Sequence, residues 1–207
     1  MTRLYIDKRE VAPLPSNLGS LDQVLRLVES DHLPDNMVIR QVQVDGVPLI
    51  QDNQEAGFQD DICDREKIEI FTATLREVAV DSIREAVTYL ARAEAAIPSL
   101  SSSLRIQAEP EASSNLRQFY EGIYFINLLL QRLEQAFQVP FASLKLRSGS
   151  AEDCRFKLAD LLKEVIEAHE KQNFGMLADL LEYEIGPLIP AFKETFETIN
   201  SRIQMEQ

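Results

Sequence analysis

The sequence predicts an α+β fold, in which a small mixed sheet is followed by a bundle of helices. In residues 1–72, apolar and polar residues alternate in short runs, which is the pattern of strands that bury one face. From Leu75 onward, the apolar residues recur in steps of three and four, which is the spacing of one helix face. We therefore expect two domains, residues 1–72 and residues 73–207.

The first domain is expected to contain four or five strands. Alternating or β-branched runs predict strands at 3–7, 37–44 and 47–50. Residues 8–11 fit either a turn or the start of a partner strand, and the run 67–72 fits either a final strand or the start of a helix. Asp45-Gly46 joins two of these runs, and this dipeptide supplies the positive φ angles of a two-residue hairpin turn. Pro48 marks the return strand as an edge, because proline cannot donate to a ladder. Residues 51–64 are polar and are expected to form a loop.

One helix interrupts these strands. Ser20 with Gln23 three residues later is a capping-box pattern, and the helix that it begins should end before Pro34. Two strands, one helix and two or three further strands follow one another in this domain. This order resembles that of a small β-grasp-like module.

The second domain is expected to form an antiparallel four-helix bundle. The four apolar stripes run over Leu75–Ile97, Leu116–Phe137, Cys154–Ala168 and Leu177–Ile203. Pro98 and the serines after it should end the first helix. Ser150 with Asp153 predicts the start of the third helix, and Asn173 predicts a short turn into the last one.

Pro187 lies inside the stripe of the last helix. It has no amide hydrogen to donate to the carbonyl of Tyr183, so the helix should bend or break near Gly186. The apolar spacing nevertheless continues through this point. We therefore predict a kinked helix rather than two separate helices, and a straight, fully bonded helix would contradict this prediction.

The formal net charge is −13, from 34 acidic and 21 basic residues. Both domains are acidic: residues 1–72 contain 14 acidic and 7 basic residues, and the rest of the chain contains 20 acidic and 14 basic residues. An acidic surface repels phosphate backbones, so nucleic acid is not an expected partner. The apolar runs are too short to span a membrane, and the N-terminus has no apolar core of a signal peptide. We expect a cytoplasmic protein.

The candidate chemical groups are few. Cys63 and Cys154 are far apart in sequence and form no CxxC pair, which favours a reducing compartment. His169 lacks the glutamate three residues earlier that di-iron bundles use, since that position is Ile166. Glu184 lies at the edge of the last stripe, where it would either be a boundary glutamate that pairs with an arginine or reaches water, or act as a partly buried acid with a raised pKa. The phosphate-loop, dinucleotide, zinc-protease and serine-hydrolase motifs do not occur, so we expect no enzyme, cofactor, metal or catalytic residue.

Aromatic and apolar residues beside the helix stripes are the better functional candidates. The second helix of the bundle is more apolar than one stripe requires, at Tyr120, Tyr124, Phe125 and Leu129. Tyr183 points away from the stripe of the last helix. Such residues could anchor a partner protein, pack on the first domain, or meet a second copy of the chain.

Three stretches carry a resemblance to known proteins: IEIFTATLREV, EGIYFINLLLQRL and MLADLLEYEIGPLIPAF. They are similar to small uncharacterised bacterial helical-bundle proteins with an N-terminal β-grasp-like module, and ADLLEYE-x-x-PL at Ala178–Leu188 carries most of the likeness. The resemblance covers about two thirds of the chain. It transfers no functional residue, and it favours a non-enzymatic role.

These observations lead to three functional hypotheses. The first is an interaction or adaptor protein, chaperone-like, that holds the helix of a partner protein in a groove of the bundle. The second is a structural protein that forms a homodimer through the bundle. The third is a ligand-binding bundle or enzyme that uses Glu184, Tyr183 or His169, and it requires at least two of them to converge on one pocket.

Overall fold

The computed structural model describes residues 2–11, 14, 18–49, 65–106, 109–147 and 149–205. The chain is a mixed α+β protein, as predicted, and it divides into two compact units, Met1–Ala79 and Val80–Gln207. The division predicted after residue 72 precedes the observed one, which falls inside helix α2 (Leu75–Arg105). Cys63 and the predicted loop at 51–64 lie outside the described residues.

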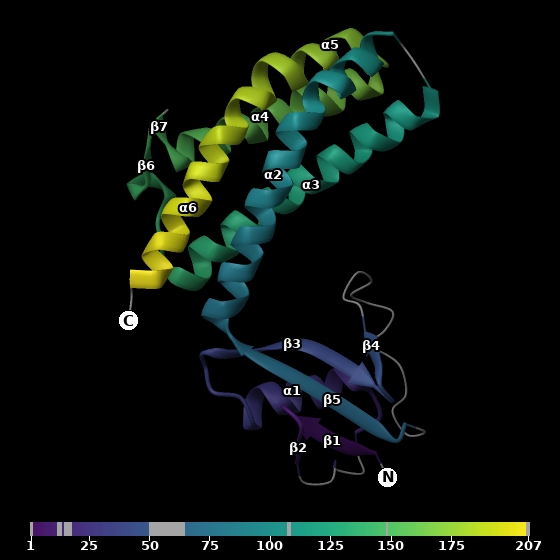
Figure 1. Ribbon diagram of the computed structural model, residues 1–207, viewed down its shortest axis with the longest axis vertical. Coiled ribbons are helices and arrows are strands. Elements are labelled where there is room, and N and C mark those ends of the chain that lie inside the picture. The colour runs from purple at the N-terminus through teal and green to yellow at the C-terminus, as the bar shows by residue number, and fades with distance from the viewer. Residues whose placement is uncertain are drawn as a thin grey trace. The chain divides into compact units, whose positions relative to one another are not determined.

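The first unit contains a five-stranded sheet. Its strands are β1 (Arg3–Ile6), β2 (Arg9–Glu10), β3 (Met37–Val44), β4 (Val47–Leu49) and β5 (Lys67–Thr74). They lie in the order β2-β1-β5-β3-β4, with β1 parallel to β5 and the other neighbours antiparallel (Figure 1). The run 67–72 is therefore a strand and not the start of a helix. Pro48 lies in the edge strand β4, opposite Gln43, as predicted.

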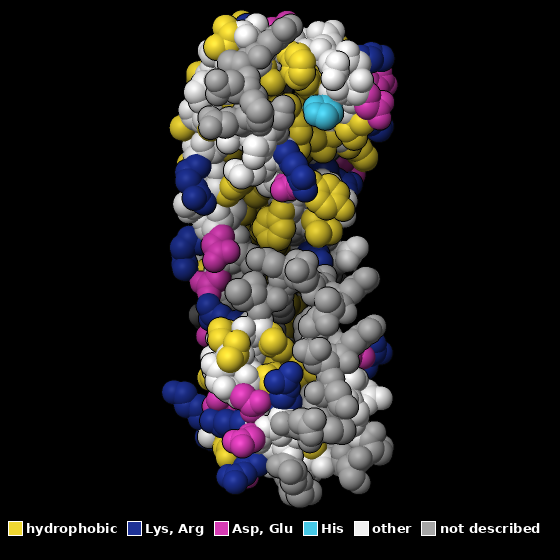
Figure 2. Space-filling model, turned by 90° about the vertical axis from the view of Figure 1, so that its right-hand side faces the viewer, with side chains coloured by type: hydrophobic (Ala, Val, Ile, Leu, Met, Phe, Trp, Pro, Cys, Tyr) yellow, Lys and Arg dark blue, Asp and Glu magenta, His cyan; other side chains and the backbone are white. Residues whose placement is uncertain are grey.

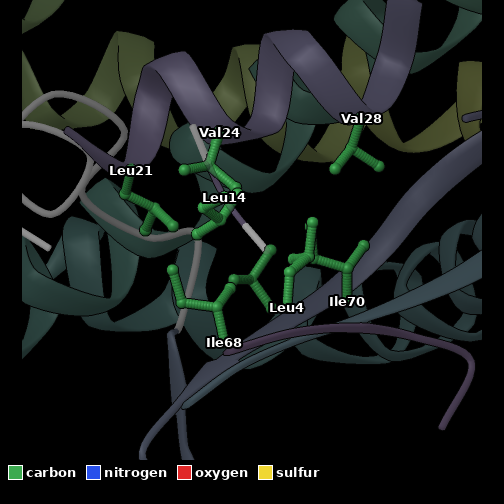
Figure 3. Close-up of a cluster of buried hydrophobic side chains, with 8 residues drawn as sticks. Leu4, Leu14, Leu21, Val24, Val28, Ile68 and Ile70 are labelled. Carbon is green, nitrogen blue, oxygen red and sulfur yellow. The ribbon is translucent and has the colours of Figure 1, made fainter. Parts of the chain in front are cut away.

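Helix α1 (Leu21–Asp31) packs on this sheet. The capping box of Ser20 and Gln23 is present, and Asp45 and Gly46 have φ angles of 52° and 80°, so both local predictions are confirmed. One cluster of buried aliphatic side chains joins the helix to the strands (Figure 3); its members are Leu4, Leu14, Leu21, Val24, Val28, Val42, Ile68 and Ile70. Burial of each such side chain stabilises the fold by roughly 1.5–3 kcal/mol.

The second unit is helical. After α2 it contains α3 (Glu109–Phe137), α4 (Ala151–Glu170), α5 (Phe174–Asp179) and α6 (Ile189–Met205). A short hairpin of β6 (Lys145–Leu146) and β7 (Gly149–Ser150) precedes α4, after the 3-10 turn η1 (Phe141–Ser143). Ser150 and Asp153 form the predicted capping box, and Asn173, at the predicted turn, caps α5 by accepting from the amide of Met176. None of the helices in the described part of the chain combines the length and the apolarity that crossing a bilayer requires.

Helix α2 does not end at Pro98, and the prediction that it would is wrong. The helix continues to Arg105, because the residues after the proline are held by other parts of the unit. Leu100 and Leu104 are buried, and Ser101 Oγ donates to the carbonyl of Ala178 on α5 at 3.3 Å. These contacts outweigh the single amide that Pro98 removes.

The last helix departs from regular α-helix where Pro187 predicts it. A π-helical segment, η2 (Leu180–Ile185), follows α5, and a 3-10 turn, η3 (Gly186–Leu188), leads into α6. The amide of Gly186 donates to the carbonyl of Leu181, five residues earlier. The wider turn avoids the bond to Tyr183 that Pro187 cannot make. The apolar stripe stays buried on both sides of the interruption, at Leu181, Ile185, Leu188 and Phe192.

Candidate functional site

Helices α2 and α3 meet where Tyr89 lies against Gly122. Tyr89 Oη donates to the carbonyl of Phe119 at 3.0 Å. A Cβ atom on Gly122 would lie 1.9 Å from Tyr89 Oη, so only glycine fits under this ring. Partial burial raises the pKa of the Tyr89 hydroxyl above its ordinary value. The tyrosine ring therefore acts as a fixed spacer between the two helices.

Beside this contact, α2 and α3 enclose a groove of about 330 Å³, which we call the α2–α3 groove. Helix α2 lines it with small side chains, Ala93, Ala96, Ser99 and Ser103. The buried side chains of Leu100 and Phe119 also line it. A wall of small residues allows another backbone to approach closely.

An exposed aromatic side chain continues this edge of α3. Phe125 follows Gln118 of the groove by seven residues, which at 100° per residue places it about 20° away on the helix wheel. Its side chain is 52% exposed. Arg92 is the charged residue of the groove lining, and it forms no ion pair with any described residue. The edge thus offers an apolar anchor and a cation that forms no ion pair with a described acid.

The other predicted anchors on α3 differ in exposure. Tyr124 is 64% exposed, on the side of the helix away from the groove. Tyr120 is half-buried, its ring meets that of Phe119 edge-on at 5.9 Å, and its buried hydroxyl has no hydrogen-bond partner among the described residues. Burial strongly raises the pKa of this hydroxyl. Leu129 is 8% exposed and belongs to the core, which corrects its assignment as a surface anchor.

Tyr183 and Glu184 both line a second groove, between α4 and the segment formed by α5 and η2. Glu184 forms an ion pair with Lys157 of α4 at 3.0 Å, so it is a boundary glutamate, although its partner is a lysine and not the predicted arginine. Tyr183 is 63% exposed. His169 is exposed near the end of α4 and does not line this groove. Two of the three candidate residues therefore converge, and the histidine does not join them.

The remaining acids of the ADLLEYE stretch contact α2. Arg105 donates to Asp179 at 2.9 Å and to Glu182 at 2.7 Å. The hydrogen bond to Asp179, and after it the one to Glu182, raises the pKa of the guanidinium above its ordinary value. The described residues contain no group of three or more histidine, cysteine or acidic side chains placed to hold a metal ion.

Sequence reasoning missed Tyr89, Gly122 and Arg105. A signal for Gly122 exists, because an isolated glycine inside a helical pattern indicates close approach of another group. The partners of Tyr89 and Arg105 lie 30 and 74–77 residues away in sequence, respectively. Nothing in the local pattern around either residue points to those partners.

Both grooves lie in one segment that is shared with other proteins. Residues 81–195 match a family described as a domain of unknown function, DUF8042, and this segment is more than half of the chain. The chain belongs to the DUF8042 family. The DUF8042 segment contains the residues that line both grooves, whereas the five-stranded sheet precedes it. Neither a curated protein nor a solved structure matches the chain.

The surface of the DUF8042 segment carries several exposed apolar side chains. Figure 2 views the molecule from the side of α3 and shows hydrophobic side chains, aromatic rings among them, on the helical unit. The large exposed apolar residues of the segment are Ile106, Tyr124, Phe125, Phe156, Ile166, Met176 and Tyr183. Exposed apolar surface of this kind marks candidate interaction sites.

Proposed function

We propose that this DUF8042 protein is a non-enzymatic interaction protein, an adaptor or chaperone-like binder that holds an amphipathic helix of a partner protein in the α2–α3 groove. We further propose that the helical unit is an antiparallel four-helix bundle, with α5, η2, η3 and α6 as its fourth member. The first unit would be a β-grasp-like module, an assignment supported by the strand order β2-β1-β5-β3-β4 with one helix packed on the sheet. A cytoplasmic location is part of the same proposal.

The observation that carries the proposal is the wall of small residues on α2 together with the buried side chains of Leu100 and Phe119 in the same groove. The lining of α2 runs from Tyr89 to Ser103, on the order of 20 Å of helix, which matches an amphipathic helix of about four turns. Ala93 and Ala96 permit close packing, and Leu100 and Phe119 offer contact to the apolar face of the guest. Phe125 would extend the apolar contact along α3, and Arg92 would pair with an acid of the guest.

Self-association is the alternative that the exposed aromatics also support. Tyr124 and Phe125 are adjacent on α3 and both are more than half exposed. A second copy of the chain would then cover the surface that carries these two aromatic side chains. A molar mass measured by light scattering distinguishes a homodimer from a complex with another protein.

A catalytic role for Tyr183 and Glu184 is less well supported than binding. The carboxylate of Glu184 is already engaged by Lys157, and His169 lies elsewhere on α4. The groove that the tyrosine and the glutamate share instead combines exposed apolar side chains with ion pairs, as interaction surfaces do.

The test fills the α2–α3 groove without touching the core. Ala96 is exposed and lines the groove, whereas its neighbour Ala95 is exposed and does not line it, so Ala96→Trp and Ala95→Trp are a matched pair. Wild-type, Ala96→Trp and Ala95→Trp baits are incubated with lysate of the source organism, and bound proteins are quantified by mass spectrometry. A stoichiometric partner should bind to the wild type and to Ala95→Trp, and its capture should fall at least tenfold with Ala96→Trp. Equal capture by all three baits, or a homodimer that captures nothing, would contradict the proposal.

A further inference from the structure

A second groove lies between α4 and the continuous helical segment of α5 and η2; we call it the α4–η2 groove. Its floor is apolar, because Leu161 of α4 and Leu180 of η2 line it and are both buried. Met176 and Tyr183 stand at its edge with exposed fractions of 39% and 63%. Exposed methionine and tyrosine beside a buried leucine floor form a surface that a partner can desolvate.

The rim of this groove is acidic. Four of its lining residues are acids, Asp160, Glu164, Asp179 and Glu184, and one is a base, Lys157, so the lining itself has a formal charge of −3 (one minus four), of which Lys163 and Arg105 beside it offset two. Three of the acids form ion pairs at 2.8–3.0 Å, with Lys163, Arg105 and Lys157, while Glu164 forms no ion pair with any described residue. Glu164 therefore presents a carboxylate that no described base neutralises, and the exposed ion pairs beside it are weak enough to exchange partners when a cation of a partner arrives.

The π-helical segment is an independent feature of the same groove. Sustained π-helical bonding is rare, and it is found frequently at functional sites. Pro187 provides the local cause, but the widened turn carries Leu180, Tyr183 and Glu184, which are the floor, edge and rim of the groove on this side. A regular α-helix would present these three side chains at different angles.

We propose that the α4–η2 groove binds a basic amphipathic helix of a second partner protein. The apolar face of that helix packs on Leu161, Leu180 and Met176, and its lysines and arginines meet the acidic rim. Charge complementarity selects this occupant, because an acidic helix or a phosphate-bearing ligand would be repelled by the same rim. With a different guest in the α2–α3 groove, the DUF8042 unit would bridge two proteins.

The test uses a fluorescein-labelled 18-residue peptide with leucines at helical spacing and lysines elsewhere, and a matched peptide with glutamate in place of every lysine. Binding to the full-length protein is followed by fluorescence anisotropy at low and at high salt. The lysine peptide should bind saturably at low salt and lose at least tenfold in affinity at high salt, and the glutamate peptide should not bind. Binding of both peptides, or saturable binding of neither, overturns the proposal.

Charge-matched variants separate this groove from general attraction to an acidic protein. Glu164→Lys places a base on the rim, and Glu197→Lys makes the same change of charge at an exposed site on α6, outside the groove. Glu164→Lys should weaken the lysine peptide at least tenfold and Glu197→Lys less than twofold, with folding of both checked by circular dichroism. Equal weakening by the two variants overturns the proposal.

Two aromatic variants and the groove-filling variant complete the comparison. Tyr183→Ala should weaken the lysine peptide several-fold, whereas Tyr124→Ala, which truncates an equally exposed tyrosine on α3, should not. Ala96→Trp should leave this affinity unchanged, because Ala96 lines the other groove. If Ala96→Trp weakens the peptide as much as Glu164→Lys, the peptide occupies the α2–α3 groove and the second site is refuted. The two proposals can therefore fail separately.

Discussion

The α2–α3 groove and the α4–η2 groove lie in the same helical unit, and they differ in side-chain size and in charge. The first is walled by alanine and serine and has one charged lining residue, Arg92. The second has leucines in its floor and five charged residues on its rim, four of them acids. The first is suited to close backbone approach, and the second to long side chains that end in a positive charge.

On the two proposals above, this difference would let one helical unit distinguish two guests. Binding in the α2–α3 groove should depend on shape and should change little with salt, because few charges are involved. Binding in the α4–η2 groove should weaken as salt rises. The helices that form the two grooves are held together by contacts that can be changed one at a time.

The largest expected effect is at the crossing of α2 and α3. Gly122→Ala would place a methyl group 1.9 Å from Tyr89 Oη, so the ring must move and lose its bond to the Phe119 carbonyl. Overpacking of this kind costs about 1–3 kcal/mol, and the better helix propensity of alanine returns up to about 1 kcal/mol. We expect a net loss of about 1–2 kcal/mol in the free energy of unfolding, measured by urea titration.

Two comparisons test this explanation. In a Tyr89→Ala background the steric conflict is gone, so Gly122→Ala should stabilise the protein instead of destabilising it. Gly175→Ala in α5, where the nearest atom lies 3.8 Å from the added methyl group, should be neutral or stabilising in the wild type. Gly122→Ala should also weaken partner capture in the α2–α3 groove and leave the lysine peptide bound. If the sign of the effect stays the same without Tyr89, the crossing is not held by this contact.

The sequence predicts the repeating features of the fold better than its interruptions. The change of period near residue 72 separates sheet from helices, and the capping boxes at Ser20 and Ser150 begin helices where expected. The predicted end of α2 at Pro98 was wrong, because it considered only the amide that proline lacks, whereas the buried residues after Pro98 continue the helix. At Pro187 the predicted departure from α-helical bonding is present, because the missing amide acts on the helix that contains it, and the kink itself stays a prediction.

The candidate sites were less predictable from sequence than the fold. The exposure of Tyr124, Phe125 and Tyr183 follows from their positions on a helix wheel, and all three are exposed. Leu129 has a similar position at the edge of its stripe but is buried, because the helices packed around it decide its exposure. Both grooves depend on which helices are neighbours, and one sequence does not contain that information.

A smaller effect is expected from restoring the missing amide in the last helix. Pro187→Ala allows a bond to the carbonyl of Tyr183, so η2 should shift toward regular α-helix and change the angles of Tyr183 and Glu184. We expect the lysine peptide to bind several-fold more weakly, while stability changes by less than about 1 kcal/mol. Pro190→Ala, in the first turn of α6, is the matched control and should not affect the peptide. Unchanged binding by Pro187→Ala would show that the π-helical turn is unrelated to the α4–η2 groove.

The smallest effect concerns the buried hydroxyl of Tyr120 on α3. Burial raises its pKa in the folded protein above the ordinary value of 10.0. A raised folded pKa means that the folded state holds the proton more tightly than the unfolded state above pH 10. This contribution to stability is therefore complete below that pH and is lost as the pH rises further. Tyr120→Phe should make the free energy of unfolding less sensitive to pH above 10. At neutral pH this free energy should be unchanged or slightly higher, because the variant removes a buried hydroxyl that has no hydrogen-bond partner among the described residues. The control is Tyr124→Phe, at an exposed site one turn later on the same helix, which should change neither the pH sensitivity nor the stability at neutral pH. Equal behaviour of the two variants would place the Tyr120 hydroxyl in solvent.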